Sequence, residues 1–216
     1  MRKMKILLAA FDPFGGAAVN PALEAVKQVQ NTIENCPVAK VEIPTVFHRS
    51  IKVLREKIEE LQPDIILVAG QAGGRAQISV ERLGINIDDA RIPDNQGNQP
   101  VDEKIVPGGP EAYFSNLPIK AMAASIRREG VPAEVSNTAG TFVCNHILYG
   151  LLHHIETEKL QARGGFIHVP FIPAQVTNKP GQPSMAPGDI TKALEAALRA
   201  AVRYQEDIRS EEGSLH

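Results

Sequence analysis

Cysteine is scarce in this chain, since only Cys36 and Cys144 occur among its 216 residues. Two cysteines cannot form the disulfide framework of a small secreted protein, and no spacing of cysteine and histidine resembles a zinc site. Long apolar runs are also missing, because none approaches the ~18 residues that span a bilayer. The short run at residues 5–11 ends at Asp12-Pro13 without the cleavage site of a signal peptide. We therefore expect a cytoplasmic protein with reduced thiols and no membrane contact.

Charge of one sign is not in excess either. The formal net charge is −2, the isoelectric point is about 6.3, and lysine and arginine form no stripe. Such a surface makes nucleic acids and anionic membranes poor candidate partners. No break in composition divides the chain, so we expect a single domain over residues 1–216. A chain of this length buries roughly 70% of its unfolded surface.

The order of apolar segments predicts an α/β fold. Apolar runs at 5–10 and 65–69 are typical of parallel strands covered on both faces, and 38–47 is also strand-like. Helical spacing over 21–30, with Asn20 as the expected N-cap, and over 50–61 gives a β-α-β-α-β rhythm. The pattern predicts a doubly wound α/β domain. Its later elements are a helix at 118–129, a strand at 131–135, a helix ending near 158, a strand at 165–169, a helix at 189–204 and a polar tail at 205–216 that is expected to fray.

Residues 71–117 break this rhythm. Short strands are expected within 78–88, whereas proline, glycine and asparagine at 93–100 and 107–110 indicate turns. A long irregular excursion in a compact domain is usually a functional loop or an interface arm. We expect 71–117 to have one of these roles.

Cys144 stands where a predicted strand, a break at 139–141 and a predicted helix follow one another. In the first turn of a helix the unpaired N–H groups and the macrodipole favour a thiolate. Thr141 is the expected N-cap. Such a cysteine can act as a nucleophile, and the same N–H groups can stabilise an oxyanion. The alternative is that Cys144 is a small buried hydrophobe.

A thiol nucleophile needs a base and a group that orients the base. Of the six histidines, His48 follows a predicted strand and His168 lies near the end of another, and the carboxyl ends of strands in such a sheet form the ligand-binding rim. This rule predicts that Cys144 and His168 face one crevice from neighbouring strand ends. Nothing predicts Cys36 at this rim. The orienting acid stays open among five residues, which are Asp12, Glu81, Asp88, Asp89 and Asp94.

The glycine-rich segment at 70–75 offers a different hypothesis. Its backbone N–H groups and Arg75 could cradle a phosphate, as in a phosphate-dependent transferase similar to nucleoside phosphorylases. The segment lacks both the Lys-Ser/Thr of a P-loop and the Gly-x-Gly-x-x-Gly spacing, so this signal is weak. A binding module without catalysis, in which Cys144 only packs, is the third hypothesis.

Two long segments resemble the signatures of the pyroglutamyl peptidase I family, also called pyrrolidone-carboxylate peptidases. Residues 70–75 and 78–86 are similar to the glutamate signature of this family of cysteine peptidases, and 135–145 is similar to its cysteine signature. Segments 11–16, 90–95 and 164–170 match as well, so the resemblance covers almost the whole chain. Gly84 stands where the family usually has alanine, a change expected to lower strand stability without touching a catalytic group.

The resemblance implies a three-layer α/β/α sandwich around a mostly parallel twisted sheet, and commonly a homotetramer. It implies a cysteine exopeptidase that removes an N-terminal pyroglutamyl (5-oxoprolyl) residue from peptides through a thioester, without metal or other cofactor. Cys144 would be the nucleophile, His168 the base and Glu81 the residue that orients the base. Arg91 would assist at the oxyanion. The residues implied for the pyroglutamate pocket are Phe11, Phe14, Gln71, Phe142 and Val143.

Overall fold

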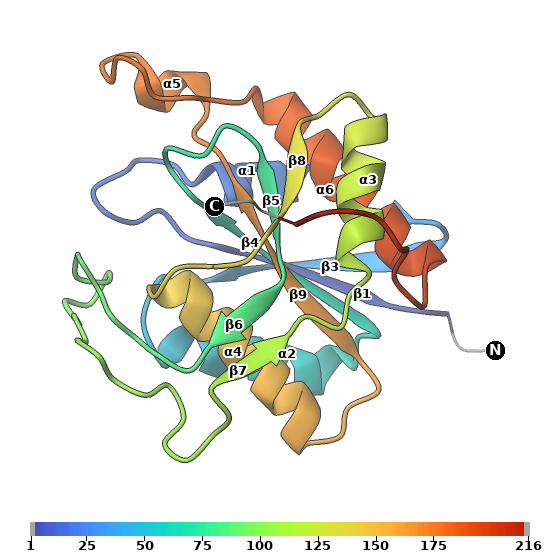
Figure 1. The fold of residues 1–216 in the computed structure, drawn as a ribbon, viewed down its shortest axis with the longest axis horizontal. Helices are drawn as coiled ribbons and strands as arrows, with labels where there is room; N and C mark the ends of the chain where they lie inside the picture. Colours follow the sequence, from blue (N-terminus) through green and yellow to red (C-terminus); the bar gives the residue numbers. More distant parts are fainter. Residues whose placement is uncertain (1–2, 214–216) are drawn as a thin grey trace.

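The computed structural model describes residues 3–213. Helices and strands alternate as the sequence predicts for most of the chain (Figure 1). The strands are β1 (Ile6–Phe11), β2 (Thr32–Ile33), β3 (Cys36–Ile43), β4 (Ile65–Gln71), β5 (Ile78–Glu81), β6 (Leu83–Ile85), β7 (Ala112–Phe114), β8 (Ala133–Ser136) and β9 (Arg163–Val169). The helices are α1 (Pro21–Gln28), α2 (Arg49–Leu61), α3 (Ile119–Arg128), α4 (Val143–Thr157), α5 (Pro173–Val176) and α6 (Pro187–Arg203).

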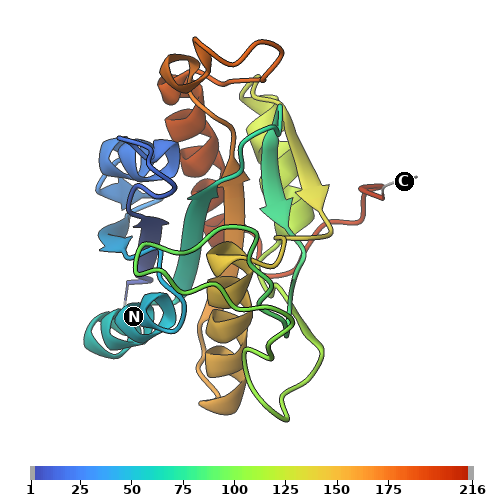
Figure 2. The same cartoon turned by 90° about the vertical axis from the view of Figure 1, so that its left-hand side faces the viewer.

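A seven-stranded sheet in the order β2-β3-β1-β4-β9-β5-β8 forms the middle of the molecule. The strands β3, β1, β4 and β9 run parallel to one another, so the prediction of a mostly parallel sheet is confirmed. Two pairings are antiparallel, β2 with β3 and β5 with β9. Because β8 is parallel to β5, the last two strands run opposite to their neighbour β9 (Figure 2).

Helices cover both faces of the sheet, which gives the three layers of an α/β/α sandwich. In Figure 1, α1, α3 and α6 lie above the sheet and α2 and α4 lie below it. Alternation along β1 supplies both cores, because Leu8 packs with the first set of helices and Leu7 with the second. The second core, between the sheet and α4, is the one that borders Cys144.

The segment 71–117 contains short strands, as expected for 78–88, and also β7, which the sequence did not predict. The strands β6 and β7 form a separate antiparallel pair beside α4, and residues 86–111 hold no helix or strand of more than one residue. A Cβ added to Gly84 would lie 2.7 Å from the backbone nitrogen of Tyr149 in α4. Gly84 therefore also has a packing role that was not expected, because the missing side chain lets β6 approach this helix.

Local capping explains several boundaries. The side chain of Asn20 accepts a hydrogen bond from the N–H of Ala22 at 3.0 Å, so its prediction as the N-cap of α1 is confirmed. The expected fraying of the tail is wrong for residues 205–213. Asp207 accepts hydrogen bonds from the N–H groups of Lys120 and Ala121 at the start of α3, at 3.0 and 2.9 Å. Residues 214–216 of the predicted tail lie outside the described part of the chain.

None of the helices within residues 3–213 is both long enough and apolar enough to cross a membrane.

Candidate active site

Cys144 is the second residue of α4, so its predicted position in the first turn is confirmed. The N-cap is Phe142 rather than Thr141, and no side chain caps this helix. The Thr141 hydroxyl instead donates to the backbone oxygen of Asp89 at 2.7 Å, because the chain is already extended at Phe142. The N–H groups of the first turn of α4 are therefore left without a capping side chain.

The sulfur of Cys144 lies against the backbone of β4. A Cβ added to Gly70 would come within 3.1 Å of this sulfur and within 2.8 Å of the Phe166 ring. Gly70 is the register partner of His168 on β9, and the rings of Phe166 and His168 are 4.7 Å apart. Alternation along β9 puts Phe166 and His168 on the same face of the sheet. Cys144 and His168 thus face the same side, as expected.

The reason given for that proximity was nevertheless wrong. The strand before Cys144, β8, is not a neighbour of β9, because β5 lies between them. Since β5 and β8 run antiparallel to β9, the carboxyl end of β8 points away from the rim where β4 and β9 end. Residues 137–142 then connect β8 to the start of α4, whose Cys144 sits beside Gly70 near that rim.

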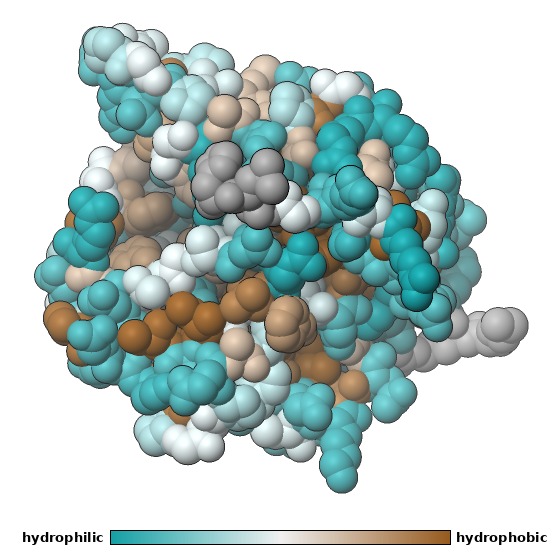
Figure 3. Space-filling model, viewed as in Figure 1, coloured by the Kyte–Doolittle hydropathy of each residue, from teal (hydrophilic) through white to brown (hydrophobic). Residues whose placement is uncertain are grey.

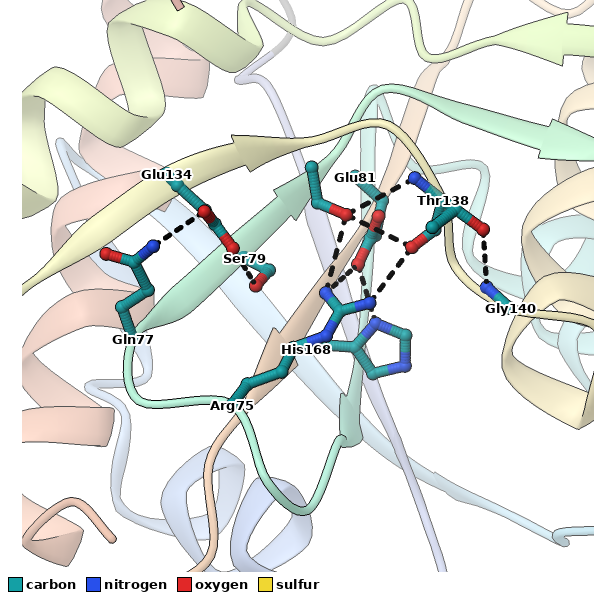
Figure 4. A network of polar contacts seen from close by, with 9 residues as sticks. Arg75, Gln77, Ser79, Glu81, Glu134, Thr138, Gly140 and His168 are labelled. Atoms are coloured by element: carbon teal, nitrogen blue, oxygen red, sulfur yellow. Dashed lines mark hydrogen bonds and ion pairs between the residues drawn. The ribbon is translucent and has the colours of Figure 1, made fainter. Parts of the chain in front are cut away.

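His168 and Glu81 form a buried pair (Figure 4). Nδ1 of His168 is 2.7 Å from Oε1 of Glu81, and the two side chains are 4% and 0% exposed. An ionised carboxylate can only accept hydrogen bonds, so Nδ1 of His168 carries the hydrogen. Nε2 is then the basic nitrogen of the neutral ring. Pairing of β5 with strands on both sides buries Glu81 fully.

Arg75 contacts the same carboxylate oxygen. Its Nη1 donates to Oε1 of Glu81 at 2.7 Å and to the Ser136 hydroxyl at 3.4 Å, while Nη2 donates to the backbone oxygen of Thr138 at 3.0 Å. In Figure 4 the Arg75 guanidinium and the His168 imidazole both reach the same oxygen of the Glu81 carboxylate. Nothing in the sequence indicated this pairing, because Arg75 lies in the irregular turn that precedes β5.

The electrostatic environment differs from the one expected for Cys144. Burial, aided by the negative charge of Glu81, raises the pKa of the Cys144 thiol to about 12, although Arg75 acts in the opposite direction. Burial also lowers the pKa of His168 below its ordinary value of 6.5, against the opposing effect of Glu81. The predicted low thiol pKa is therefore wrong for the resting site. At neutral pH the site holds a thiol beside a neutral imidazole, which is able to take the thiol proton.

Aromatic rings gather around Phe142, two residues before Cys144. The ring centroids of Phe14 and Phe142 are 6.2 Å apart, and those of Phe47 and Phe142 are 5.4 Å apart. Phe14 and Gln71 line a cavity of about 520 Å³. Phe11, by contrast, is 1% exposed and packs on Phe166.

The other residues predicted for the site differ in burial and location. Val143 is fully buried in the core beneath α4. The side-chain oxygen of Gln71 accepts a hydrogen bond from Gln175 of α5 at 2.8 Å, which leaves the Gln71 amide nitrogen as a donor. Arg91 is exposed and lines a different cavity of about 470 Å³ with residues of the 140–142 turn. Gln175 was not anticipated from sequence, since α5 was not.

His48, the other histidine considered as a base, is joined through its backbone to a buried hydrogen-bonded pair. The backbone N–H of His48 donates to Nε2 of His146 at 2.9 Å, and Nδ1 of His146 lies 2.8 Å from a carboxylate oxygen of Asp88. This buried His146–Asp88 pair ties α4 to the 86–111 segment.

The other acids weighed with Glu81 also hold loops. Asp12 accepts from the N–H of Thr45 at 2.7 Å, and Asp94 accepts from that of Phe47 at 3.0 Å. Only Glu81 among the five contacts His168 within the described residues. Cys36 is buried at β3, on the far side of β1 and β4 from the His168 strand.

No group of three or more histidine, cysteine, aspartate or glutamate side chains suited to a metal ion occurs within residues 3–213.

Comparison with known proteins gives a consistent family. The family model for pyroglutamyl peptidase matches residues 4–204. The pyrrolidone-carboxylate peptidase of Clostridium perfringens (strain 13 / Type A) is 55% identical over 212 residues, which is 98% of this chain and 100% of that protein. The crystal structure of pyroglutamyl peptidase I from Bacillus amyloliquefaciens is 51% identical, has a TM-score of 0.94 and covers 97% of this chain and 100% of its own.

A more distant structure has the same fold. A mutant pyrrolidone carboxyl peptidase from Pyrococcus furiosus is 42% identical, has a TM-score of 0.89 and covers 92% of this chain and 98% of its own. The family model and these relatives each span nearly the whole chain. The chain therefore belongs to the pyroglutamyl peptidase family.

Proposed function

We propose that this protein removes an N-terminal pyroglutamyl residue from peptides by cysteine-dependent hydrolysis. Cys144 is the nucleophile, His168 the general base and acid, and Glu81 the residue that orients the imidazole. The observation that carries the proposal is the packing of the Cys144 sulfur on Gly70, the register partner of His168, whose Nδ1 is bound to a buried carboxylate. Family membership supports the choice of substrate.

Acylation follows from the protonation states of the site. Nε2 of His168 takes the proton from Sγ of Cys144 as the sulfur attacks the carbonyl carbon that follows the lactam ring. The new S–C bond forms, the C–N bond breaks, and His168 returns the proton to the leaving amine. A water molecule, deprotonated by His168, then attacks the thioester. Pyroglutamate leaves, and the sulfur regains its proton.

The raised pKa of the Cys144 thiol makes this proton transfer essential. A thiol with a pKa of about 12 is almost entirely protonated at neutral pH, so little thiolate exists before substrate binds. The neutral His168 supplies the base at the moment of attack. As negative charge moves from sulfur to the carbonyl oxygen, the uncapped N–H groups of the first turn of α4 can accept it, that of Cys144 first among them.

Recognition of the lactam ring is assigned to the aromatic rings beside Cys144. The flat neutral ring would pack against Phe14 and Phe142, whose ring centroids are 6.2 Å apart and whose planes are tilted by 40°. The free amide donor of Gln71 can pair with the lactam carbonyl. Proline lacks this carbonyl and would leave the donor unpaired, while glutamine would bring an ammonium group into an apolar slot. We include Phe11 and Val143 as the buried floor of this pocket and Arg91 only as a rim residue.

The proposal is tested by hydrolysis of a pyroglutamyl chromogenic amide. Purified protein should release the chromophore, and iodoacetamide should abolish the release. The matching prolyl amide is the control for the lactam carbonyl and should be cleaved at least ~100-fold more slowly. Equal cleavage of both amides, or turnover that survives complete alkylation of Cys144, would contradict the proposal.

The phosphate-dependent transferase is disfavoured by the contacts of Arg75. Its guanidinium already donates to Glu81, Ser136 and Thr138, so a phosphate would compete with a buried carboxylate for the same charge. A noncatalytic binding module is disfavoured by the buried Glu81–His168 pair, which a packing role for Cys144 does not require. Turnover that depends on added phosphate, or no turnover of any amide, would favour these alternatives.

We further propose that the protein is a homo-oligomer, a tetramer by the resemblance described above. The large apolar side chains that are exposed within residues 3–213 all belong to the 71–117 segment, and they are Ile92, Val101 and Phe114. Figure 3 shows apolar side chains across the face that carries β6 and β7. Sedimentation equilibrium tests this assembly.

The cytoplasmic location stays a prediction, supported by the two unpaired cysteines.

A further inference from the structure

Arg75 stands apart from the three residues of the proposed mechanism, yet its guanidinium contacts one of them directly. We infer that Arg75 is a positioning residue for the proposed reaction. Its guanidinium holds the Glu81 carboxylate directed at His168, and its second nitrogen fixes the turn that leads to the Cys144 helix. The inference rests on the proposed function, since it concerns the same site, and it assigns a role to a residue outside the Cys144–His168–Glu81 set.

The setting of the Glu81 carboxylate makes a compensating charge necessary. Glu81 is 0% exposed, and both of its partners, Nδ1 of His168 and Nη1 of Arg75, meet the same oxygen at 2.7 Å. The other oxygen, Oε2, is buried without a hydrogen-bond partner. A buried carboxylate held only by a neutral imidazole would tend to take up a proton. Arg75 is the cation in contact with this carboxylate, and at 27% exposure its charge is only partly screened.

The direction of the effect follows from the charge of Arg75. The active form of the site has a neutral His168 imidazole, and a nearby positive charge disfavours the protonated imidazole. Loss of the Arg75 charge must therefore raise the pH at which His168 sheds its proton. The same loss makes deprotonation of Cys144 harder, since Arg75 lowers the pKa of both Cys144 and His168.

Other charged groups around His168 do not replace Arg75. Glu81 comes from β5, the Cys144 thiol from α4 and Arg75 from the turn after β4. Glu134 of β8 lies nearby in Figure 4, but its carboxylate accepts from Ser79 at 3.1 Å and from Gln77 at 2.6 Å.

Arg75 also holds the chain just before the predicted nucleophile. Nη2 donates to the backbone oxygen of Thr138, and the Ser136 hydroxyl donates to the same oxygen at 3.1 Å. Gly140, two residues later, donates its N–H to the Thr138 hydroxyl at 3.1 Å. These contacts set the turn of residues 136–140, from which the chain enters α4. One side chain thereby links the acid of the proposed mechanism to the approach of its nucleophile.

The test compares Arg75→Gln with a matched control, Arg82→Gln. Arg82 is the neighbour of Glu81 and donates to Asn137 of the same turn at 2.7 Å, but it has no contact with Glu81. The pH profile of kcat/KM is measured with a pyroglutamyl chromogenic amide, and the rate of Cys144 alkylation by iodoacetamide is measured at pH 8 in a Cys36→Ser background. Arg75→Gln should move the acidic limb upward by roughly one pH unit and slow alkylation about tenfold. Arg82→Gln should leave both unchanged.

A merely structural role would lower activity equally at every pH. The inference would be overturned by a folded Arg75→Gln variant whose acidic limb of kcat/KM lies at the same pH as in the parent and whose Cys144 is alkylated at the parental rate. If this variant does not fold, Arg75→Lys decides the question, because it keeps the charge. For Arg75→Lys we expect the acidic limb to stay at the pH of the parent and the activity to stay within about threefold of the parent's. A loss of activity above about tenfold at all pH values would refute the role of charge. If the parent cleaves no pyroglutamyl amide, the proposed function fails, while the alkylation rates still test Arg75.

Discussion

The sulfur of Cys144 lies directly beside Gly70 on one face of the sheet, since a Cβ added to Gly70 would sit 3.1 Å from that sulfur. The glycine leaves room for the thiol above the strand that borders His168. Any side chain at position 70 would have to displace the sulfur or the ring of Phe166, which is nearer still at 2.8 Å. The position of the predicted nucleophile thus depends on a residue with no chemistry of its own.

We expect Gly70→Ala to lower kcat on a pyroglutamyl amide by about 100-fold, because misplacing a reacting atom by about 1 Å has effects of this size. The free energy of unfolding should fall by only about 1–3 kcal/mol, as for other overpacked sites. Gly188→Ala, at the start of α6 where an added Cβ meets nothing within 4 Å, is the control and should be neutral. Parental kcat in a folded Gly70→Ala variant would exclude close packing at the sulfur as a catalytic requirement.

We expect Cys144→Ser to lose at least ~1,000-fold in kcat while the melting temperature stays near that of the parent. The hydroxyl is a much weaker nucleophile than sulfur when a neutral imidazole is the only base. Cys36→Ser is the matched control. Cys36 is buried at β3 and its thiol donates a hydrogen bond to the backbone oxygen of Glu34 at 3.5 Å, so activity and sensitivity to alkylation should persist. Retained turnover in Cys144→Ser would remove the assignment of the nucleophile.

The pH dependence should reflect the buried His168. Burial lowers its pKa below 6.5, so the acidic limb of kcat/KM should lie below pH 6.5 in the parent. Glu81 acts against burial and raises the pKa of His168. Glu81→Gln should therefore move the limb to lower pH while kcat falls, which is the opposite direction to Arg75→Gln. If the acidic limb of kcat/KM moved in the same direction in Glu81→Gln and Arg75→Gln, the coupled Arg75–Glu81–His168 arrangement would be contradicted.

Much of the fold could be predicted because period and burial agree along most of the chain. Continuous apolar runs gave β1 and β4, and the spacing of Ile51, Leu54 and Ile58 gave α2. Prediction failed where pairing across the sheet decides the structure. Two-residue β2 and three-residue β7 carry no periodicity of their own, and the antiparallel insertion of β5 beside β9 is set by contacts distant in sequence.

The site divides in the same way. The sequence identified Cys144 and His168 from their places after strands, and resemblance selected Glu81 from five acids. Local pattern could not supply the hydrogen bonds that hold them, because Arg75 and Gln175 act through partners 6 and 104 residues away. The prediction that the pKa of the Cys144 thiol is low was wrong for a related reason. A helix terminus is a local feature, whereas burial by β4 and β9 and the charge of Glu81 come from other parts of the chain.

The Phe14 ring should matter for substrate more than for the thiol. Phe14→Ala removes one side of the Phe14–Phe142 pair and should lower kcat/KM for pyroglutamyl amides by about 10–200-fold, mostly through KM. Alkylation of Cys144 by iodoacetamide should change less than about threefold, because Phe14 makes no contact with the Glu81–His168 pair. Phe114→Ala, at a side chain that is 69% exposed on β7, is the control for loss of an aromatic ring. Equal losses of turnover and alkylation in Phe14→Ala would indicate a folding defect rather than a pocket.

Gly84→Ala tests the contact between β6 and α4. An added Cβ would lie 2.7 Å from the Tyr149 backbone nitrogen and 3.2 Å from the Leu148 side chain, and helix backbone cannot give way as a flexible side chain can. We expect a loss of about 1–3 kcal/mol in the free energy of unfolding, which corresponds to about 2–4 °C in Tm per kcal/mol for a chain of this size. Because Cys144 begins the same helix, kcat should fall as well, in proportion to the shift of α4. A Tm equal to or above the parental value would mean that the helix retreats without cost, and calorimetry on Gly84→Ala beside the neutral Gly188→Ala distinguishes the two outcomes.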